Sequence, residues 1–493
     1  MYLLGYDIGS SSIKVALVKA ENGAVVEVVQ HPATELGMIA HHPGWAEQHP
    51  ETWWDSLCQA TQMLLKSKGI STKEIASIGI AYQMHGLVLV DENQKVLRPS
   101  IIWCDSRAVE IGNRAFRDIG EKRCLEHLLN SPGNFTASKL KWVRDNEPDL
   151  YKRIHKFMLP GDYIAMKLTG NICTTISGLS EGILWDFKEN TPAYLLLDYY
   201  GIDTGLLPEI KDTFCVQGKL TREAAAQTGL AEGTPVSYRA GDQPNNALSL
   251  GVYQPDSVAA TGGTSGVVYG VVDEARYDLQ SRINGFAHVN HQPEAPRLGL
   301  LLCINGAGIQ YAWLRQHMSK ERRSYSEMEQ MAASVSIGAD GLRIIPFGNG
   351  AERMLCNANP GAQVNNLQFN RHGQEHFYRA ALEGIAFSFV YGFQVLKELG
   401  LNPKIIKVGN DNLFQSRIFS STVSNLLNCS IEVIETTGAV GAAKASGIAT
   451  AHYSNLNEAF QNNTVEQVFH PENQTDAHVA AYQLWLRDLE KLI

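Results

Sequence analysis

The sequence has no apolar run near the ~20 residues that a helix needs to cross a bilayer. Its first residues lack the basic region of a secretory signal and reach an aspartate at position 7. Cysteines are few and dispersed, eight in 493 residues with no Cys-X-X-Cys pair, which favours free thiols in a reducing compartment. We therefore expect a cytoplasmic protein without a membrane partner.

Positive charge is also scarce, and several signature motifs are missing. With 42 Lys and Arg against 51 Asp and Glu, the net charge is −9 at pH 7, which argues against nucleic acid as the main partner. The chain has no GxxxxGK(S/T) loop, no GxGxxG, no HExxH and no GxSxG. His41, His42, His288 and His291 have no third ligand at a recognisable spacing, so loop histidines explain them better than a metal site.

The length and the pattern of apolar residues favour two α/β domains. A single hydrophobic core rarely grows beyond roughly 300 residues, so 493 residues imply two large domains. Apolar strands are expected at 3–7, 13–19, 25–30 and 75–81, with helical spacing at 51–66. This alternation predicts a largely parallel sheet. We place the domains at residues 1–248 and 249–493, packed closely because no low-complexity linker separates them.

A second strand, turn and strand at 258–269 echoes the hairpin at the start of the chain. The first turn holds Gly9, Ser10 and Ser11, and the second holds Gly263 and Thr264. Two such hairpins predict a duplicated α/β unit in which each half contributes one phosphate-binding turn to a shared cleft. The repeat is short, and a chance similarity explains it about equally well.

Two carboxylates, Asp7 and Asp242, follow apolar runs in a way that suits phosphoryl transfer. The Gly/Ser turn after Asp7 offers backbone N–H groups and hydroxyls to phosphate oxygens, and Lys14 and a metal held by Asp7 would add positive charge. Asp242, between Gly241 and amide side chains, could take the proton from an acceptor hydroxyl, as transfer from ATP requires. A solvated turn at Asp7 and an Asx turn at Asp242 are the alternatives.

Other candidate ligands in the first half follow predicted strands. Met84 and His85 come after strand 75–81, and Trp103 and Asp105 come at the end of a short strand at 100–103. Open α/β sheets bind ligands outside the carboxyl ends of their strands. His85 could bond to a sugar hydroxyl and Trp103 could stack on a sugar face, although each also fits a buried structural side chain.

In the second half, Gly306 and Gln310 open a predicted helix whose backbone donors could meet a phosphate or ribose. Gly409 and Asn410 follow a predicted strand at 405–408.

Together these segments resemble the FGGY family of carbohydrate kinases. The motifs occur in family order between residue 3 and about residue 450, so the resemblance covers nearly the whole chain. The best matches are 44–50 (GWAEQHP), 83–86 (QMHG), 135–143 (FTASKLKWV), 159–163 (LPGDY), 263–266 (GTSG), 350–353 (GAER) and 381–384 (ALEG).

The resemblance implies an α/β fold of two actin-like, ribonuclease H-like domains with ATP and a sugar in the cleft between them. It implies Asp242 as general base and Asp7 and Asp242 near Mg²⁺. The sugar is expected at Met84, His85, Trp103, Asp105 and Gln243. The expected nucleotide-binding residues are Ser10, Ser11, Lys14, Gly263, Thr264, Gly306, Gln310, Gly409 and Asn410.

Within the family, the motifs are most similar to those of kinases that convert D-xylulose to D-xylulose 5-phosphate. Because the family often forms dimers, we also expect a homodimer. Gln243 departs from this group, which commonly has Asn there, whereas glycerol kinases have Gln. A kinase for ribulose, glycerol or another polyol therefore stays open. Two non-enzymatic alternatives are an actin-like ATP-binding module and an inactive sugar sensor, and the presence of both Asp7 and Asp242 counts against the sensor.

Overall fold

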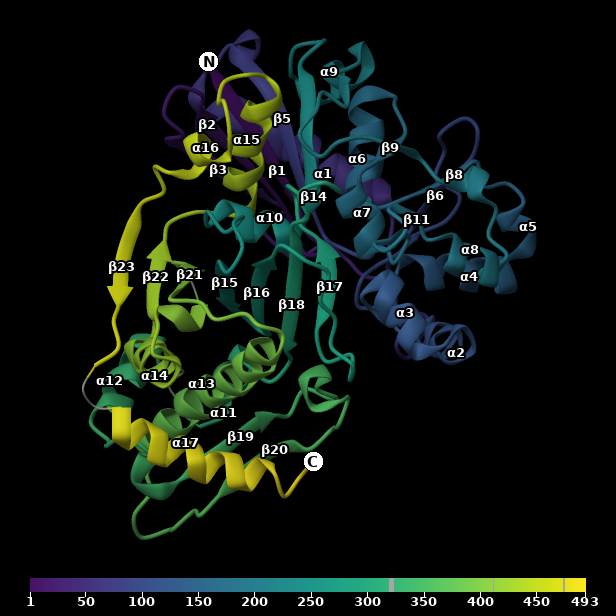
Figure 1. Cartoon of the computed structure of the whole chain (residues 1–493). Helices are drawn as coiled ribbons and strands as arrows, with labels where there is room; N and C mark the ends of the chain where they lie inside the picture. Colours follow the sequence, from purple (N-terminus) through teal and green to yellow (C-terminus); the bar gives the residue numbers. More distant parts are fainter. Residues whose placement is uncertain (319–322, 411, 473–474) are drawn as a thin grey trace.

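The computed structural model describes residues 1–318, 323–410, 412–472 and 475–493. Two twisted sheets, one above the other in Figure 1, form its centre. The first has the order β13 (Gly218–Lys219), β14 (Pro235–Gly241), β5 (Ile75–Tyr82), β1 (Tyr2–Ile8), β2 (Ile13–Lys19), β3 (Val25–His31). The second has the order β17 (Asn284–Ala287), β18 (Leu298–Ile304), β16 (Gly266–Val272), β15 (Val258–Gly262), β21 (Ile405–Gly409), β22 (Ser430–Ile434), β23 (Val465–Phe469).

The two sheets repeat one topology. In the first, β1 and β2 form an antiparallel hairpin, and β1, β5 and β14 are parallel neighbours. In the second, β15 and β16 form the hairpin, and β15, β21 and β22 are the parallel neighbours. An antiparallel strand closes the parallel side of each sheet, β13 in one and β23 in the other. The predicted duplication of an α/β unit is therefore confirmed.

Short strands pair outside the sheets. They are β4 (Glu47–Gln48) with β7 (Ser100–Ile101), β6 (Val88–Val90) with β8 (Lys156–Met158), β9 (Cys173–Thr174) with β12 (Glu209–Ile210), β10 (Trp185–Asp186) with β11 (Thr191–Pro192), and β19 (Arg343–Phe347) with β20 (Gly361–Asn365).

Helices cover the sheets and build a side lobe. The helices of the first half are α1 (Pro50–Lys68), α2 (Val109–Ile119), α3 (Glu121–Leu128), α4 (Thr136–Asn146), α5 (Pro148–Tyr151), α6 (Pro160–Thr169), α7 (Ile176–Glu181), α8 (Tyr194–Tyr200), α9 (Arg222–Thr228) and α10 (Asp242–Ser249). Those of the second half are α11 (Gly308–His317), α12 (Tyr325–Ala333), α13 (Gln374–Glu398), α14 (Arg417–Leu427), α15 (Gly438–Ala449), α16 (Leu456–Phe460) and α17 (Thr475–Leu489).

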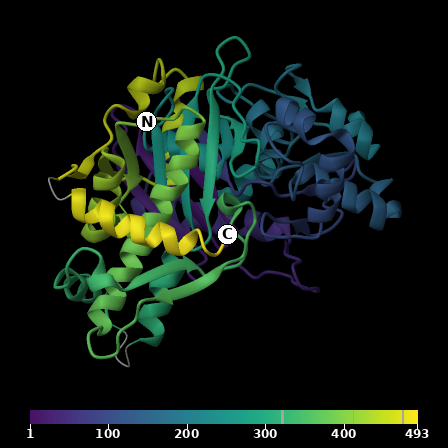
Figure 2. The same cartoon turned by 60° about the horizontal axis from the view of Figure 1, so that its bottom comes forward.

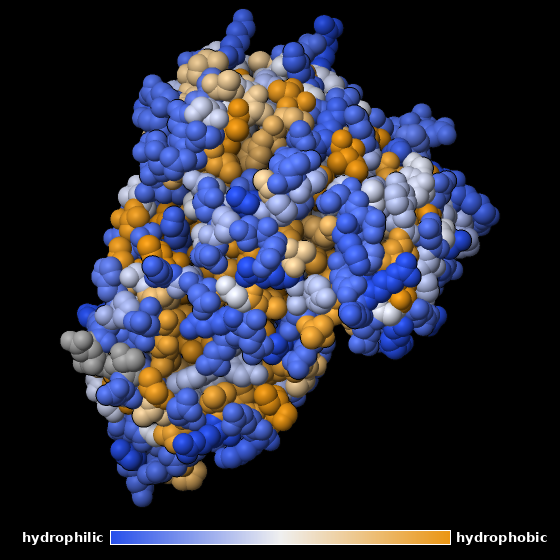
Figure 3. All heavy atoms as spheres, in the orientation of Figure 1, coloured by the Kyte–Doolittle hydropathy of each residue, from blue (hydrophilic) through white to orange (hydrophobic). Residues whose placement is uncertain are grey.

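The side lobe holds α2 to α5 and α8, and it projects from the first sheet in both cartoon views (Figures 1 and 2). Its apolar side chains form one buried cluster that also takes in Phe286 and Leu301 of the second sheet. In the space-filling view the surface is mostly hydrophilic, and the outline is indented between this lobe and the lower part of the molecule (Figure 3). Among the described residues, no helix has the length and apolar character to cross a membrane.

Helix α15 returns from the second sheet to pack against the first. Its small residues, including Ala439, Ala442 and Ala443, share a buried cluster with Leu3 of β1 and Ala81 of β5. A Cβ added to Gly5 would lie 1.9 Å from the carbonyl oxygen of Ala439, and one added to Gly79 would lie 2.0 Å from that of Ala442. The two glycines thus allow the helix backbone to touch the strands.

The predicted boundary at 248 and 249 falls at the end of α10, and it stays a prediction. Helix α10 lies between the sheets, and β15 begins at Val258 (Figure 1). However, α15 and α16 pack with the first sheet, although they fall within 249–493. The second half of the sequence therefore does not form one packing unit.

Gly5→Ala tests the contact between α15 and β1. The added methyl overlaps a backbone carbonyl that cannot rotate away, so we expect the free energy of unfolding to fall by about 2 kcal/mol or more. Gly37→Ala is the matched control, because a Cβ there meets nothing within 4 Å. Equal thermal midpoints for the two variants would contradict this close packing.

Candidate active site

Three parallel strands bring predicted site residues to one edge of the first sheet. Asp7 on β1 lies in the same row as Ala81 of β5 and Ala240 of β14. His85 follows the end of β5, and Asp242 follows the end of β14 directly. Because parallel strands end at the same edge, the two carboxylates and the histidine lie on one side of the sheet.

Asp242 opens α10 and is partly buried. Burial raises the pKa of its carboxyl to about 8, and the negative charges of Asp7 and Glu181 act in the same direction. Hydrogen bonds with Gln243 partly offset this rise. The charge of Asp242 also contributes to the raised pKa of Cys303 on β18, which places Asp242 near the second sheet. A carboxylate with a pKa near neutrality is suited to general-base work.

Asp7 lies where three elements converge. Burial raises the pKa of its carboxyl, and Lys14, its partner across the β1–β2 hairpin, lowers it. A Cβ added to Gly438 would lie 2.7 Å from Asp7 Oδ2 and 2.8 Å from Asn246 Oδ1. The start of α15 and the side chain of Asn246 on α10 therefore border the carboxylate, and Gly438 leaves the room beside it.

His85 is fixed from three sides. Its backbone N–H donates to Glu181 Oε2 at 2.6 Å, and its Nδ1 lies 2.8 Å from the Glu181 carbonyl oxygen. Phe135 and Phe286 pack against its ring, with ring centroids at 4.8 Å and 5.5 Å. The fully buried Lys139 ammonium donates to the carbonyl oxygen of His85 at 2.8 Å. Sequence reasoning missed Glu181, Phe286 and Lys139, and only the FTASKLKWV motif pointed near any of them.

Met84 and Gln83 line the same region. A Cβ added to Gly241 would lie 2.6 Å from Met84 Cγ, so Met84 touches the backbone just before Asp242. The Gln83 side chain is buried, yet neither its oxygen nor its nitrogen has a hydrogen-bond partner in the protein. Buried amides are normally satisfied, so these atoms suit a polar ligand.

Trp103 and Asp105 have different surroundings. The Trp103 side chain is half exposed, and its Nε1 donates to Ser10 Oγ at 3.4 Å, beside the turn that also carries Ser11. Asp105 is fully buried, and its carboxylate accepts from the backbone N–H of Ala46 at 2.6 Å and from the guanidinium of Arg107. These contacts engage both carboxylate oxygens of Asp105 within the protein, and its contact with a sugar stays a prediction.

In the second sheet, the hairpin turn and α11 are joined through their backbones. The N–H of Gly308 donates to the carbonyl of Gly263 at 3.1 Å, and that of Ile309 donates to Thr264 at 3.0 Å. The side-chain oxygen of Gln310 is buried without a partner. The predicted residues at the turn and at the start of α11 are therefore neighbours.

Glu352, of the GAER motif, holds the segment before α11. Its buried carboxylate accepts from the backbone N–H groups of Asn305 at 2.9 Å and Gly306 at 2.7 Å, and burial raises its pKa to about 7. Gly409 ends β21 and the exposed Asn410 follows it, at the same edge of the second sheet as the turn. The N–H of Asn410 donates to Ile434 of β22.

The carboxylates fit a Mg²⁺ ion that is shared with phosphates rather than a closed metal cage. No group of three or more His, Cys, Asp or Glu side chains is placed to bind a metal in the part of the chain that the structure describes. Mg²⁺ usually takes one or two carboxylates and completes its shell with water and substrate phosphates. Asp7 and Asp242, each raised in pKa by burial, suit such a cation.

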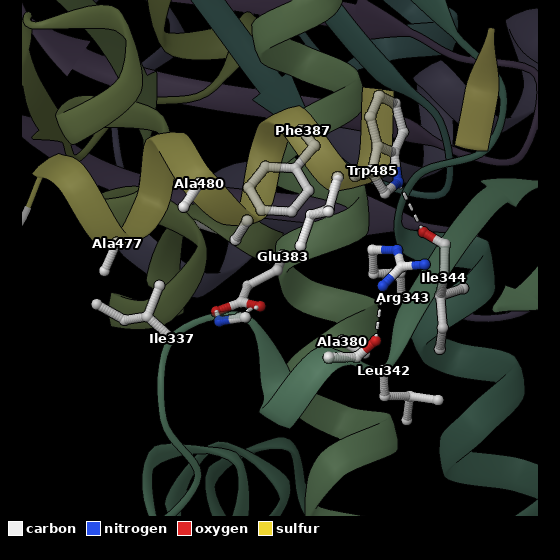
Figure 4. Close-up of a pocket in the computed structure, with 14 residues that line it drawn as sticks. Ile337, Leu342, Arg343, Ile344, Ala380, Glu383, Phe387, Ala477, Ala480 and Trp485 are labelled. Atoms are coloured by element: carbon white, nitrogen blue, oxygen red, sulfur yellow. Dashed lines mark hydrogen bonds between the residues drawn. The ribbon is translucent and has the colours of Figure 1, made fainter. Parts of the chain in front are cut away.

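Two cavities formed by residues that the structure describes lie elsewhere. One, of about 280 Å³, lies between α13, α17 and β19, with Glu383 and Trp485 in its wall (Figure 4). The other, of about 730 Å³, lies between the β2–β3 turn and the start of α15, with Lys444 in its wall. Neither is lined by Asp7, His85 or Asp242.

The fold and the residues at these sheet edges define a sugar kinase. Models of the FGGY family of carbohydrate kinases match residues 2–249 (N-terminal domain) and 258–450 (C-terminal domain), and the chain belongs to this family.

Among its relatives, the xylulose kinase of Bacillus subtilis (strain 168) is 28% identical over 93% of this chain and 90% of its own length. The crystal structure of xylulose kinase from Rhodospirillum rubrum superposes with a TM-score of 0.88 at 25% identity, covering 100% of this chain and 99% of the other. Glycerol kinase from Plasmodium falciparum, solved with ADP, superposes with a TM-score of 0.89 at 19% identity, covering 100% of this chain and 98% of the other. The fold alone therefore does not distinguish ketose from glycerol acceptors.

Removing the Glu352 carboxylate tests its support of the segment before α11. Glu352→Ala leaves two buried N–H groups without an acceptor, and we expect a loss of about 2–4 kcal/mol in the free energy of unfolding. Glu352→Gln keeps one acceptor oxygen and should lose about half as much. Urea unfolding at pH 7 measures both. Equal losses in the two variants would contradict the role of these hydrogen bonds.

Proposed function

We propose that this carbohydrate kinase transfers the γ-phosphate of ATP to the terminal hydroxyl of D-xylulose, giving D-xylulose 5-phosphate and ADP. The observation that carries the proposal is the set of residues gathered where the parallel strands β1, β5 and β14 end, at one edge of the first sheet. There Asp242, with a pKa near neutrality, lies on the same side as Asp7, Met84 and His85. A sugar bound at Met84 and His85 would present a hydroxyl to a carboxylate able to take its proton.

In this proposal the first sheet binds the sugar, and the turns of both sheets bind the nucleotide. Met84, His85, Trp103 and Gln243 hold the sugar on the first sheet, and Asp242 accepts the proton from the attacking hydroxyl. Mg²⁺ near Asp7 and Asp242 would neutralise charge on the phosphates. Closure of the two halves would bring the hydroxyl in line with the γ-phosphorus and exclude water, which would otherwise take the phosphate.

The nucleotide is proposed at the equivalent turns of the two sheets. Backbone N–H groups and hydroxyls of Ser10, Ser11, Gly263 and Thr264 would cradle the phosphates, with Lys14 beside Asp7. Further nucleotide contacts are proposed at Gly306, Gln310, Gly409 and Asn410. The unpartnered oxygen of Gln310 supports this assignment, because a ribose hydroxyl would satisfy it.

Similarity to xylulose kinases over nearly the whole chain favours D-xylulose as the acceptor. Gln243 favours another polyol, and glycerol or ribulose is the second candidate.

A reducing cytoplasm is the proposed location, supported by the free state of all eight cysteines, each in a described part of the chain. The homodimer stays a prediction.

Asp242→Asn should lower kcat at least about 100-fold, because the amide cannot accept the proton. Binding of D-xylulose, measured by calorimetry, should be largely retained. Asp145→Asn, which changes an exposed carboxylate on α4, is the control and should keep its activity. An Asp242→Asn enzyme that kept more than a few per cent of wild-type turnover would remove Asp242 from this role.

The pH dependence provides an independent test. The base must be ionised, so kcat/KM at subsaturating concentrations of both substrates should fall below about pH 8, approaching tenfold per pH unit. Saturating Mg·ATP places a cation beside Asp242, which should move the acid limb of kcat to lower pH. A flat profile between pH 5.5 and 8.5 under both conditions would contradict the proposal.

A further inference from the structure

Glu181 is a buried carboxylate that the proposed chemistry does not use. It ends α7, whose first turn is capped by the side chain of Thr175, and only 2% of Glu181 is exposed. Helix α7 is also tied to the second sheet, because Ser177 Oγ donates to the carbonyl oxygen of Ala287 and Ser180 Oγ accepts from the N–H of Ala287. Glu181 is therefore held rigidly between the two halves of the molecule.

One oxygen of Glu181 is committed to His85. Oε2 accepts the backbone N–H of His85 at 2.6 Å and lies 2.9 Å from its Nδ1. The Glu181 carbonyl oxygen, 2.8 Å from the same Nδ1, is also an acceptor. Two acceptors around one ring nitrogen favour the tautomer with the proton on Nδ1, which leaves Nε2 as an acceptor for a hydroxyl.

The other oxygen of Glu181 points toward the proposed sugar site. Oε1 would lie 3.6 Å from a Cβ added to Gly241, beside Met84, and it has no hydrogen bond of normal geometry within the protein. Burial raises the pKa of the nearby Tyr82 hydroxyl, and its interaction with the Glu181 carboxylate raises that pKa further. A carboxylate oxygen has two lone pairs, so Oε1 can still accept a hydroxyl of a ligand.

The cations around Glu181 are engaged elsewhere. Arg239 forms an ion pair with Asp162, with Nε and Oδ1 2.9 Å apart, and also donates to the carbonyl oxygen of Cys173. The Lys139 ammonium is held by the carbonyl oxygens of His85 and Ile102. The titratable and charged groups that interact with Glu181 are Tyr82, His85, Lys139, Asp162 and Asp242, and Arg239 acts on two of these, Tyr82 and Asp162.

We propose that Glu181 determines the charge of the acceptor, so that the site takes an uncharged polyhydroxy compound and rejects one that carries a carboxylate. Its Oε1 would accept a hydroxyl hydrogen, and its own charge would repel an anionic sugar acid. This inference rests on the proposed function, since it requires the sugar to bind beside Met84 and His85.

Xylitol and D-xylonate are the two probes, because they differ only at one terminal carbon, which is a CH₂OH group in xylitol and a carboxylate in xylonate. Each is tested as a competitor of D-xylulose phosphorylation. In the wild type, the Ki of xylonate should exceed that of xylitol by at least about tenfold, because like charges in a buried site repel strongly. Glu181→Gln, which removes the charge and keeps the length of the side chain, should reduce this ratio by about tenfold.

Glu383→Gln is the matched control. Glu383 is equally buried, at 2% exposure, but it lies on α13 in the wall of the 280 Å³ cavity, where it accepts from Arg379 and from the Gly338 N–H (Figure 4). Neutralising it should leave the xylonate-to-xylitol ratio unchanged. An equal effect of both variants would reduce the role of Glu181 to general stability and overturn the proposal.

Two further outcomes separate this inference from the proposed function. If the wild type binds xylonate as tightly as xylitol, Glu181 does not select by charge, whether or not its variant folds. If the wild type does not phosphorylate D-xylulose, the proposed function fails, and calorimetric binding of xylitol and xylonate still tests Glu181. An unchanged ratio in a folded Glu181→Gln protein, judged by its thermal midpoint, would also overturn the proposal.

Discussion

Backbone contact between α15 and the strands β1 and β5 is the constraint on which the arrangement of the two halves depends. Gly5 and Gly79 bring helix carbonyls against the sheet with no side chain between them. The same helix begins at Gly438, beside the carboxylate of Asp7. Packing of α15 therefore fixes, in one step, how the second half of the chain lies on the first and how much space remains next to Asp7.

The site built on this frame is rich in buried carboxylates. Asp7 on β1 and Asp242 after β14 lie at one edge of the sheet, with β5 between their strands, and Glu181 raises the pKa of Asp242 beyond the effect of burial. Such a concentration of negative charge costs stability unless cations or donors compensate it. The compensation suits a kinase, because Mg²⁺ and the reacting hydroxyl would provide it only when the substrates are bound.

The sequence predicted the elements better than their contacts. The alternation of apolar residues located β1, β2, β5 and the second hairpin, because buried strands carry a strong local signal. The residue pattern singled out Asp242 and His85, which follow apolar runs, and the resemblance gave them their expected roles. Glu181 could not be found this way, since no short motif marks it and its role depends on folding of α7 against β17. Asp105 looked available in sequence but is paired with its near neighbour Arg107.

The chain passes between the two sheets at residues 250–257, 435–437 and 461–464, because α15 and α16 belong with the first sheet by packing. A joint with three crossings restrains the two sheets more tightly than the single tether that joins two independent domains. It also means that the half of the molecule that carries the proposed acceptor site is discontinuous in sequence. A fragment ending at residue 248 would leave the apolar surface around Leu3, Val18 and Ala81 uncovered. Exchange of this half with a relative, in evolution or in the laboratory, would therefore have to carry α15 and α16 with it.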